Sequence, residues 1–457
     1  MQNNQSQPWL VRGARILDPA QGVDRVGDLF FSNGAFAAPP AGGLGCGRVV
    51  EIDGAGKIAM PSPIDLHVHF REGAHGGGDA GAAALAESIA SGSCAAARGG
   101  FATVVAMPNT EPPTDTPARA RFQAAAPRHP FRALRVLPSA CCTKGRLGAE
   151  CAELEALAAA GAAAFTDDGA MVADDSVMEE AMRRAAALGV VVMDHAVVPP
   201  IAGAGVIRDC AAARALGLPL FPSEAETSAV ARDIALCRKT GCRVHIQHLS
   251  CGASVELIRA AQAEGLPVTA EATPHHLYFA AEDIPVAPGG DGVGASARPL
   301  ADYKMNPPLG TRADVAALRQ GVADGVISCF ATDHAPHSAA AKAKGFLNAP
   351  FGVIGLETAL AATYSALVAS GERGGAGECG AARSALLSPL EWAARWICGP
   401  ASVIGINAPS FAIGSHSAAT ILSLESWEVR ETDFASRSRN TPFIGATLAA
   451  KVWRMLN

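Results

Sequence analysis

Residues 58–70 read IAMPSPIDLHVHF, an apolar run that ends in two histidines two positions apart. The run is apolar at successive positions, which is typical of a strand buried on both faces in a parallel sheet covered by helices. Alternate residues of a strand point the same way, so His67 and His69 are expected to project together. Such a pair can supply two imidazole ligands to a metal ion, but two ordinary histidines in a turn would look the same. This run by itself leaves both interpretations open.

Seven further β-like runs follow, separated by alanine-rich stretches. They are FATVVAMPNT (101–110), RALRVLPSA (132–140), GAAAFTDDG (161–169), GVVVMDHAV (189–197), CRVHIQHLS (242–250), LPVTAEATPHHL (266–277) and GVISCFATDHAPH (325–337). Eight βα units over this length predict an α/β fold, a (β/α)8 barrel of the TIM type. Between the fourth and fifth runs, residues 174–189 predict a helix that Asp174 or Asp175 caps and Gly189 ends.

The segments on either side of these runs have a different pattern. Residues 8–57 and 408–457 contain short β-like stretches separated by turns. Two β-rich ends around one barrel can pair into a single small sheet. We therefore predict a small β domain built from residues 1–57 and 401–457, and a barrel over residues 58–400.

Composition and charge exclude several classes of function. The 457 residues carry 37 basic and 43 acidic side chains, and no tail concentrates either sign, so nothing favours nucleic acid or an anionic membrane surface as a partner. No apolar run reaches the ~18 residues of a membrane-spanning helix, and the N-terminus lacks a secretion signal. The 12 cysteines form no CxxC pair and are expected to be reduced thiols. These features predict a cytoplasmic protein.

Ligand-type side chains stand at the ends of four later runs. Asp168 lies in FTDDG, His195 in MDHAV, His248 in IQHLS and Asp333 in ATDHAPH. Active sites of such barrels lie at the carboxyl ends of the strands, where these side chains and the histidine pair would converge. Nitrogen and oxygen donors without cysteine suit a divalent ion of the zinc kind. Each residue alone could be a hydrogen-bonded core residue, but six of them at strand ends favour a metal site.

Eight motifs together resemble the dihydroorotase family of the amidohydrolase superfamily. They are DLHVHFRE, VVAMPNTEPPTDT, AFTDDG, VTAEATPHHL, YKMNPPL, ATDHAPH, APFGVIGLET and SRNTPF. The resemblance is closest to the bacterial kind that has an aspartate where other members carry a carboxylated lysine. The set occurs in order along most of the chain, which makes it far more specific than any single motif.

The resemblance implies one or two zinc ions and six ligands, which are His67, His69, Asp168, His195, His248 and Asp333. Asp333 would complete the site of the histidine pair. Asp168 would bridge that site to a second ion, held also by His195 and His248. Asp167, the first aspartate of the same motif, is then a structural neighbour.

The resemblance also implies the substrate contacts, which are the side chains of Arg71, Asn109, Asn306 and His337 and the backbone of Phe351 and Gly352. Arg71 is expected there without the resemblance as well. It lies two residues beyond His69 on the same face, and a guanidinium fork fits a carboxylate.

The resemblance therefore implies the activity of a dihydroorotase, the reversible zinc-dependent cyclisation of N-carbamoyl-L-aspartate to dihydroorotate in de novo pyrimidine biosynthesis. Zinc would make water a nucleophile by lowering its pKa from about 16 to about 7. Asp333 would take the proton and pass it to the leaving ring nitrogen. The expected partner is the small-molecule substrate. The expected assembly is a homodimer or a complex with aspartate carbamoyltransferase.

Two segments near the expected site depart from the family pattern, and two other functions stay open. Residues 73–85 lack the usual proline and are longer, and residues 196–216 replace a loop rich in glycine and histidine. A hydantoinase- or allantoinase-like cyclic amidase would be expected to have a lysine in place of Asp168 and to lack Arg71. A non-catalytic homologue that partners aspartate carbamoyltransferase would normally have lost metal-binding histidines.

Three other histidines are expected to have no direct part in the chemistry. His245 lies three positions before His248, so strand alternation directs its side chain away from the site, towards the helices. His275 and His276 are expected to support the site or to be structural.

Overall fold

The computed structural model describes residues 7–39, 49–73, 86–125, 134–286, 299–369 and 385–456. Eight parallel strands pair in chain order. They are β6 (Ile64–Val68), β7 (Thr103–Ala106), β8 (Arg135–Ala140), β9 (Ala164–Phe165), β10 (Val191–Asp194), β11 (Val244–Ile246), β12 (Val268–Ala272) and β13 (Cys329–Phe330). A parallel bridge from Val68 to His334, just after β13, brings the last strand back to the first. The predicted barrel is therefore confirmed, with each of the eight runs contributing a strand.

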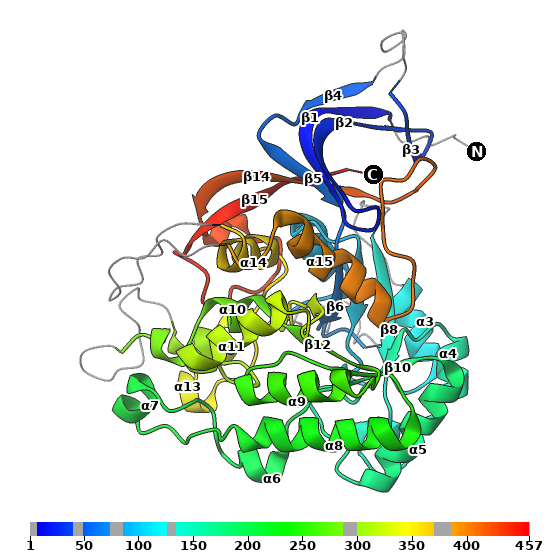
Figure 1. Ribbon diagram of the computed structural model, residues 1–457. Helices are drawn as coiled ribbons and strands as arrows, with labels where there is room; N and C mark the ends of the chain where they lie inside the picture. The colour runs from blue at the N-terminus through cyan, green and yellow to red at the C-terminus, as the bar shows by residue number, and fades with distance from the viewer. Residues whose placement is uncertain are drawn as a thin grey trace.

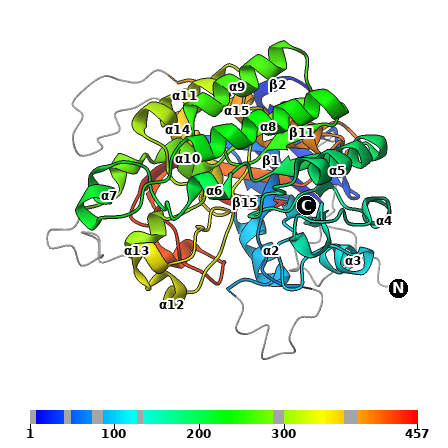
Figure 2. The ribbon, with the colours of Figure 1, turned by 90° about the horizontal axis from the view of Figure 1, so that it is seen from below.

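Helices cover the outside of the strands, and Figure 2 shows them arranged around the barrel. The longer ones are α2 (Ile89–Arg98), α3 (Pro117–Ala125), α5 (Asp175–Leu188), α8 (Glu224–Thr240), α9 (Gly252–Ala263), α11 (Arg312–Ala323), α14 (Ala359–Leu367) and α15 (Pro389–Val403). Short helices are α4 (Leu154–Ala159), α6 (Pro199–Ala202), α7 (Ala211–Leu216), α10 (Pro274–Tyr278), α12 (Ala339–Lys342) and α13 (Gly345–Asn348), and 3-10 turns are η1 (Lys144–Arg146), η2 (Ala281–Asp283), η3 (Leu300–Tyr303) and η4 (Glu431–Asp433). Helices α8 and α9 pack side by side (Figure 1).

Helix α5 shows how the sequence sets one of these elements. The Asp174 side chain accepts hydrogen bonds from the backbone of Ser176 and Val177, which caps the first turn. Gly189 ends the helix in the left-handed conformation, with a φ of 67°. The buried face of the helix includes Met178 and Met182. The helix predicted over 174–189 is confirmed, with Asp174 as its cap.

The barrel strands are apolar on both sides because each side packs in a different core. One core fills the barrel interior and includes Leu66, Val105, Met107, Met193 and Cys329, and the end of α15 contributes to the same core. The other lies between strands and helices and includes Val104, Val136, Val192, Val244 and Ile246. Polar side chains at the strand ends therefore sit on a rigid, close-packed support.

The strands from the two ends of the chain share a separate seven-stranded sheet, which lies at the top of Figure 1. Its members are β1 (Trp9–Asp18), β2 (Val23–Ser32), β3 (Ala35–Ala37), β4 (Val50–Asp53), β5 (Lys57–Pro61), β14 (Ala419–Glu428) and β15 (Thr447–Leu456). β5 pairs with both β1 and β14, which joins the two ends. The run 58–70 thus forms two strands in two sheets rather than one, since Pro61 and Pro63 interrupt it.

The described residues cover the cysteines, the helices and the glycine-rich segment only in part. Ten cysteines fall within the described residues, and all of them are free thiols. In the same part of the chain, no helix is both long enough and apolar enough to span a bilayer. Most of the glycine-rich segment 73–85 lies outside the described residues.

Candidate metal centre

The histidine pair lies at the carboxyl end of β6, facing two carboxylates. His67 is fully buried, and its Nε2 lies 3.2 Å from Asp168 Oδ1 and 3.5 Å from Asp333 Oδ1. His69 Nε2 lies 3.0 Å from the same Asp333 oxygen and 3.7 Å from Asp168 Oδ2. The ladder between β6 and β7 shifts register between Asp65 and Val68, and such irregularities re-aim a side chain. One imidazole nitrogen from each histidine thus meets the same two carboxylates.

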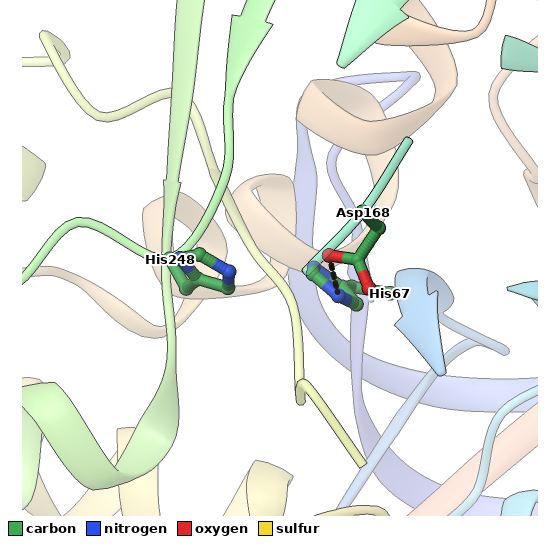
Figure 3. Close-up of side chains that lie close together, drawn as sticks. All are labelled: His67, Asp168 and His248. Atoms are coloured by element: carbon green, nitrogen blue, oxygen red, sulfur yellow. Dashed lines mark ion pairs between the residues drawn. The ribbon is translucent and has the colours of Figure 1, made fainter. Parts of the chain in front are cut away.

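His195 and His248 approach the same carboxylate from the neighbouring strands β10 and β11. His195 Nδ1 lies 3.9 Å from Asp168 Oδ1 and 2.8 Å from His248 Nε2. Candidate ligand atoms of His67, Asp168 and His248 all lie within 4.8 Å of one another, as do those of His67, His69 and Asp333. Figure 3 shows the first of these groups, with the His67–Asp168 pair marked. The structure therefore brings all six residues predicted as ligands together at one end of the barrel.

Unusual backbone conformations turn several of these side chains into the site. His248 has a φ of 31°, Asp333 of 46° and Arg71 of 55°, all in the left-handed region that non-glycine residues rarely adopt. Each such residue costs on the order of 1 kcal/mol or more, and they cluster at functional sites. The left-handed φ at His248 determines the direction in which its side chain points. Gln247 already points inward to His67, so plain alternation would direct the next side chain outward.

The prediction that His245 points towards the helices is wrong, because the left-handed φ at His248 breaks the alternation on which that prediction relied. Its Nε2 lies 3.1 Å from Glu271 Oε2 in the barrel interior. Glu271 Oε1 in turn lies 3.0 Å from His67 Nδ1. Glu271 therefore links a predicted ligand to His245, and hydrogen bonds of this kind fix the tautomer and orientation of a metal-binding imidazole. The sequence signal was an acidic residue inside the apolar strand β12, within the motif VTAEATPHHL.

The two asparagines predicted to touch substrate also contact predicted ligands. Asn109 Nδ2 donates to Asp168 Oδ2 at 2.8 Å, and its Oδ1 lies 2.9 Å from His69 Nδ1. Asn306 Nδ2 lies 2.9 Å from His195 Nε2. Both side chains therefore border the cluster and help to orient it.

Two neighbouring residues are structural. Asp167 accepts hydrogen bonds from the Thr143 backbone at 3.1 Å and from the Thr143 hydroxyl, so it faces away from the cluster. His276 Nε2 donates to Pro307 O at 2.9 Å, which connects the end of β12 to the segment carrying Asn306.

Arg71 and His337 lie together beside the cluster. Arg71 Nη2 is 3.5 Å from His337 Nε2. His337 Nε2 lies 2.7 Å from the carbonyl oxygen of Phe351, so this nitrogen carries the proton and donates it there. Arg71 cannot donate to the same atom. Burial, with the nearby Arg71 and Lys342 cations, lowers the pKa of His337 to about 3, which keeps the ring neutral near pH 7.

Charges in the cluster favour a bound cation. Burial lowers the pKa of His67, but the carboxylates of Asp168 and Asp333 outweigh it and raise this pKa well above its usual value. For Asp168 the signs are reversed. Burial raises the pKa of this carboxyl group, but the imidazoles of His67 and His69 outweigh burial and bring the pKa well below its usual value. Burial lowers the pKa of His195, and that of His248 more strongly, so both present neutral imidazoles, the form that binds metal.

The donor set fits a divalent metal ion. Among the described residues, four buried histidine ring nitrogens have no hydrogen-bond partner, and two of them, His67 Nε2 and His248 Nδ1, belong to the predicted ligands. An unpaired buried polar atom costs about 1–3 kcal/mol, which a cation would offset. The nearby donors are imidazole nitrogens and carboxylate oxygens, the set that zinc and related ions accept.

One substitution tests whether Glu271 supports a metal site. In Glu271→Gln an amide replaces the carboxylate that accepts from His67 and His245, so we expect metal affinity to fall about 10–100-fold. Competition with a chromogenic chelator would measure it. Glu264→Gln is the matched control, because Glu264 is exposed and pairs with Arg238 on the surface. Equal affinities in both variants would contradict the role given to Glu271.

Solved structures with a similar fold include hydantoinases and a dihydropyrimidinase. The L-hydantoinase of Arthrobacter aurescens matches with a TM-score of 0.75 and 22% identity, over 97% of this chain and 93% of that one. The dihydropyrimidinase of Brevibacillus agri NCHU1002 matches with a TM-score of 0.77 and 18% identity, over 99% and 94%. At these identities the likeness shows the fold alone.

Sequence comparisons give the family. A family model described as dihydro-orotase-like matches residues 56–254. A dihydroorotase of Bacillus caldolyticus is 41% identical over 86% of this chain and 84% of its own length, and one of Pelotomaculum thermopropionicum is 38% identical over 97% and 96%. Barrel, site and relatives define a metal-dependent cyclic amidohydrolase. The chain belongs to the dihydroorotase family.

Proposed function

We propose that this chain catalyses the reversible, zinc-dependent cyclisation of N-carbamoyl-L-aspartate to dihydroorotate in pyrimidine synthesis. The observation that carries the proposal is the convergence of six ligand-type side chains beside Arg71, an arginine suited to the substrate carboxylate. Curated relatives at 36–41% identity are named dihydroorotases.

In this proposal His67, His69, Asp168 and Asp333 hold one ion, and Asp168, His195 and His248 hold a second. A bound divalent ion supplies a Lewis acid that polarises the amide carbonyl and makes water nucleophilic near neutral pH.

Asp333 moves the proton. In hydrolysis its carboxylate takes a proton from the attacking water and delivers it to the ring nitrogen as the amide bond breaks. In cyclisation it takes the proton from the attacking ureido nitrogen and returns it to the departing hydroxide. His69 Nε2 and Asp333 Oδ1 lie 3.0 Å apart, so both atoms would face the same ion.

Arg71, with Asn109, Asn306 and His337, orients the substrate. The Arg71 guanidinium binds the ring carboxylate, and the Phe351 and Gly352 backbone meets the pyrimidine ring.

Alternative functions are weakened by particular residues. A hydantoinase-like enzyme would be expected to have a lysine at the position of Asp168 and would not require Arg71. The similarity to hydantoinases concerns the fold, whereas the dihydroorotase relatives have higher identity. A non-catalytic homologue would normally have lost ligands, yet five of the six candidates form two compact groups and His195 lies beside Asp168 and His248. The homodimer or aspartate carbamoyltransferase complex, the cytoplasmic location and the domain limits 1–57, 58–400 and 401–457 stay predictions.

One assay tests the proposed function. Zinc-loaded protein is given dihydroorotate, hydantoin and allantoin, and its metal content is measured alongside. We expect turnover of dihydroorotate and at least one zinc ion per chain. Turnover of hydantoin without dihydroorotate would instead support the cyclic amidase alternative. Metal-free, inert protein that binds aspartate carbamoyltransferase would support the non-catalytic one.

A further inference from the structure

Two lysines are buried beneath the segment 347–352, outside the predicted metal cluster. Lys342, at the end of α12, is 1% exposed, and Lys304, just after η3, is 2% exposed. Helices α12 and α13 lie next to each other on one side of the molecule (Figure 2), and segment 347–352 begins in α13. Fully buried lysines are rare, so each needs a physical reason.

Lys342 bonds to three backbone carbonyls. Its Nζ donates to Gly352 O at 2.9 Å, to Pro350 O at 3.1 Å and to Lys304 O at 3.2 Å. An ammonium group has three N–H donors and no acceptor, so these carbonyls match its full capacity. A neutral amine would turn its lone pair towards one of them.

Lys304 holds the same segment from another side. Its Nζ donates to Ala349 O at 2.7 Å and to Leu347 O at 2.9 Å, and it lies 4.4 Å from the centre of the Phe351 ring. The Lys304 carbonyl also accepts from Gly352 N at 3.0 Å. Backbone and side chain of Lys304 thus both bind segment 347–352.

The segment held in this way reaches the predicted substrate site. Phe351 O accepts the hydrogen bond from His337, the neighbour of Arg71. Gly352 has a φ of 122°, and a Cβ there would come within 2.7 Å of the Ala335 side chain, so only glycine fits. Asn306, which contacts His195, lies two residues after Lys304. The lysines therefore join two parts of the predicted substrate site.

This arrangement is costly for folding alone. Burial lowers the pKa of Lys342 to about 7, although the Asp302 carboxylate opposes the shift, and burial lowers that of Lys304 to about 8. Replacing buried charges by apolar side chains of similar volume is often neutral or stabilising. Two buried lysines whose Nζ atoms bind backbone carbonyls at this place therefore point to a demand other than stability.

We propose that Lys342 and Lys304 are positioning residues for the substrate: their ammonium groups fix the backbone of segment 347–352 so that Phe351 and Gly352 can meet the pyrimidine ring. The inference rests on the proposed function. Because these lysines act on binding through the backbone, they should affect ground state and transition state alike.

Lys342→Met tests this inference, since methionine fills the space without the three donors. We expect the KM for dihydroorotate to rise about tenfold or more with kcat within about threefold, as removal of uniform binding predicts. Metal content should equal that of the unmodified protein. Amide hydrogen exchange at Gly352, whose N–H is bonded to Lys304 O, should become faster.

Two further variants make the result decisive. Lys344→Met is the matched control, because Lys344 is exposed and only two residues away, and its KM should not change. Lys304→Met should raise KM in the same way and serves if Lys342→Met does not fold. An unchanged KM in the lysine variants, with only a lower melting temperature, would overturn the inference and leave the proposed function intact. An unmodified protein inert on dihydroorotate would overturn both.

Discussion

Asp333→Asn is expected to keep its metal and lose nearly all turnover. The amide preserves the shape and one oxygen of the side chain that lies 3.0 Å from His69 Nε2, but it cannot take a proton from water. Loss of a general base typically costs up to about 10⁴-fold, and we expect kcat to fall on the order of 10⁴-fold in both directions of the reaction. Initial rates and metal content of the same preparations give the measurement.

The control for Asp333→Asn is Asp324→Asn. Asp324 follows α11 and pairs with Arg259 at the surface, so its substitution should leave kcat unchanged. A kcat for Asp333→Asn within about tenfold of the unmodified protein would refute the assignment of the base. Loss of metal together with activity would instead restrict Asp333 to holding the ion.

Arg71→Met is expected to remove recognition of the carboxylate. Removing one partner of a buried charged pair costs about 2–5 kcal/mol, and a loss of about 4 kcal/mol corresponds to about 10³-fold in kcat/KM for dihydroorotate. A ring without a carboxylate makes no such contact. The inhibition constant of dihydrouracil should therefore change by less than about threefold.

Comparing dihydroorotate with dihydrouracil distinguishes loss of carboxylate binding from general damage to the folded site. Arg121→Met changes an exposed arginine on α3 and should leave both values unaltered. If Arg71→Met weakened dihydrouracil as strongly as dihydroorotate, Arg71 would support the site rather than recognise the carboxylate.

The barrel could be predicted because its signal is local. Each of the eight runs is short, apolar on both sides and followed by helix-forming residues, and strands with two buried faces leave few other solutions. The first run shows where this reasoning fails. Its first half became β5 of the small sheet, and only pairing with β1 and β14, far away in sequence, decides that.

The meeting of the ligand-type residues could be anticipated from their position at strand ends, but their support could not. Alternation predicted the wrong direction for His245, because the left-handed φ at His248 breaks the pattern. Glu271 lies 204 positions after His67, and no local pattern reports that hydrogen bond. Lys342 stands in the run AAAKAKG (339–345), where no sequence pattern marks it, and only the fold brings the carbonyls of residues 304, 350 and 352 around it.

The central claim is that side chains from five strand ends form one metal site, and anomalous diffraction at the zinc absorption edge tests it most directly. Crystals of zinc-loaded protein should show at least one peak about 2.0–2.2 Å from imidazole nitrogens of His67 and His69 and from carboxylate oxygens of Asp168 and Asp333. A peak shared by Asp168, His195 and His248 would reveal the second ion. Zinc bound only elsewhere, or no peak among these residues, would contradict the account.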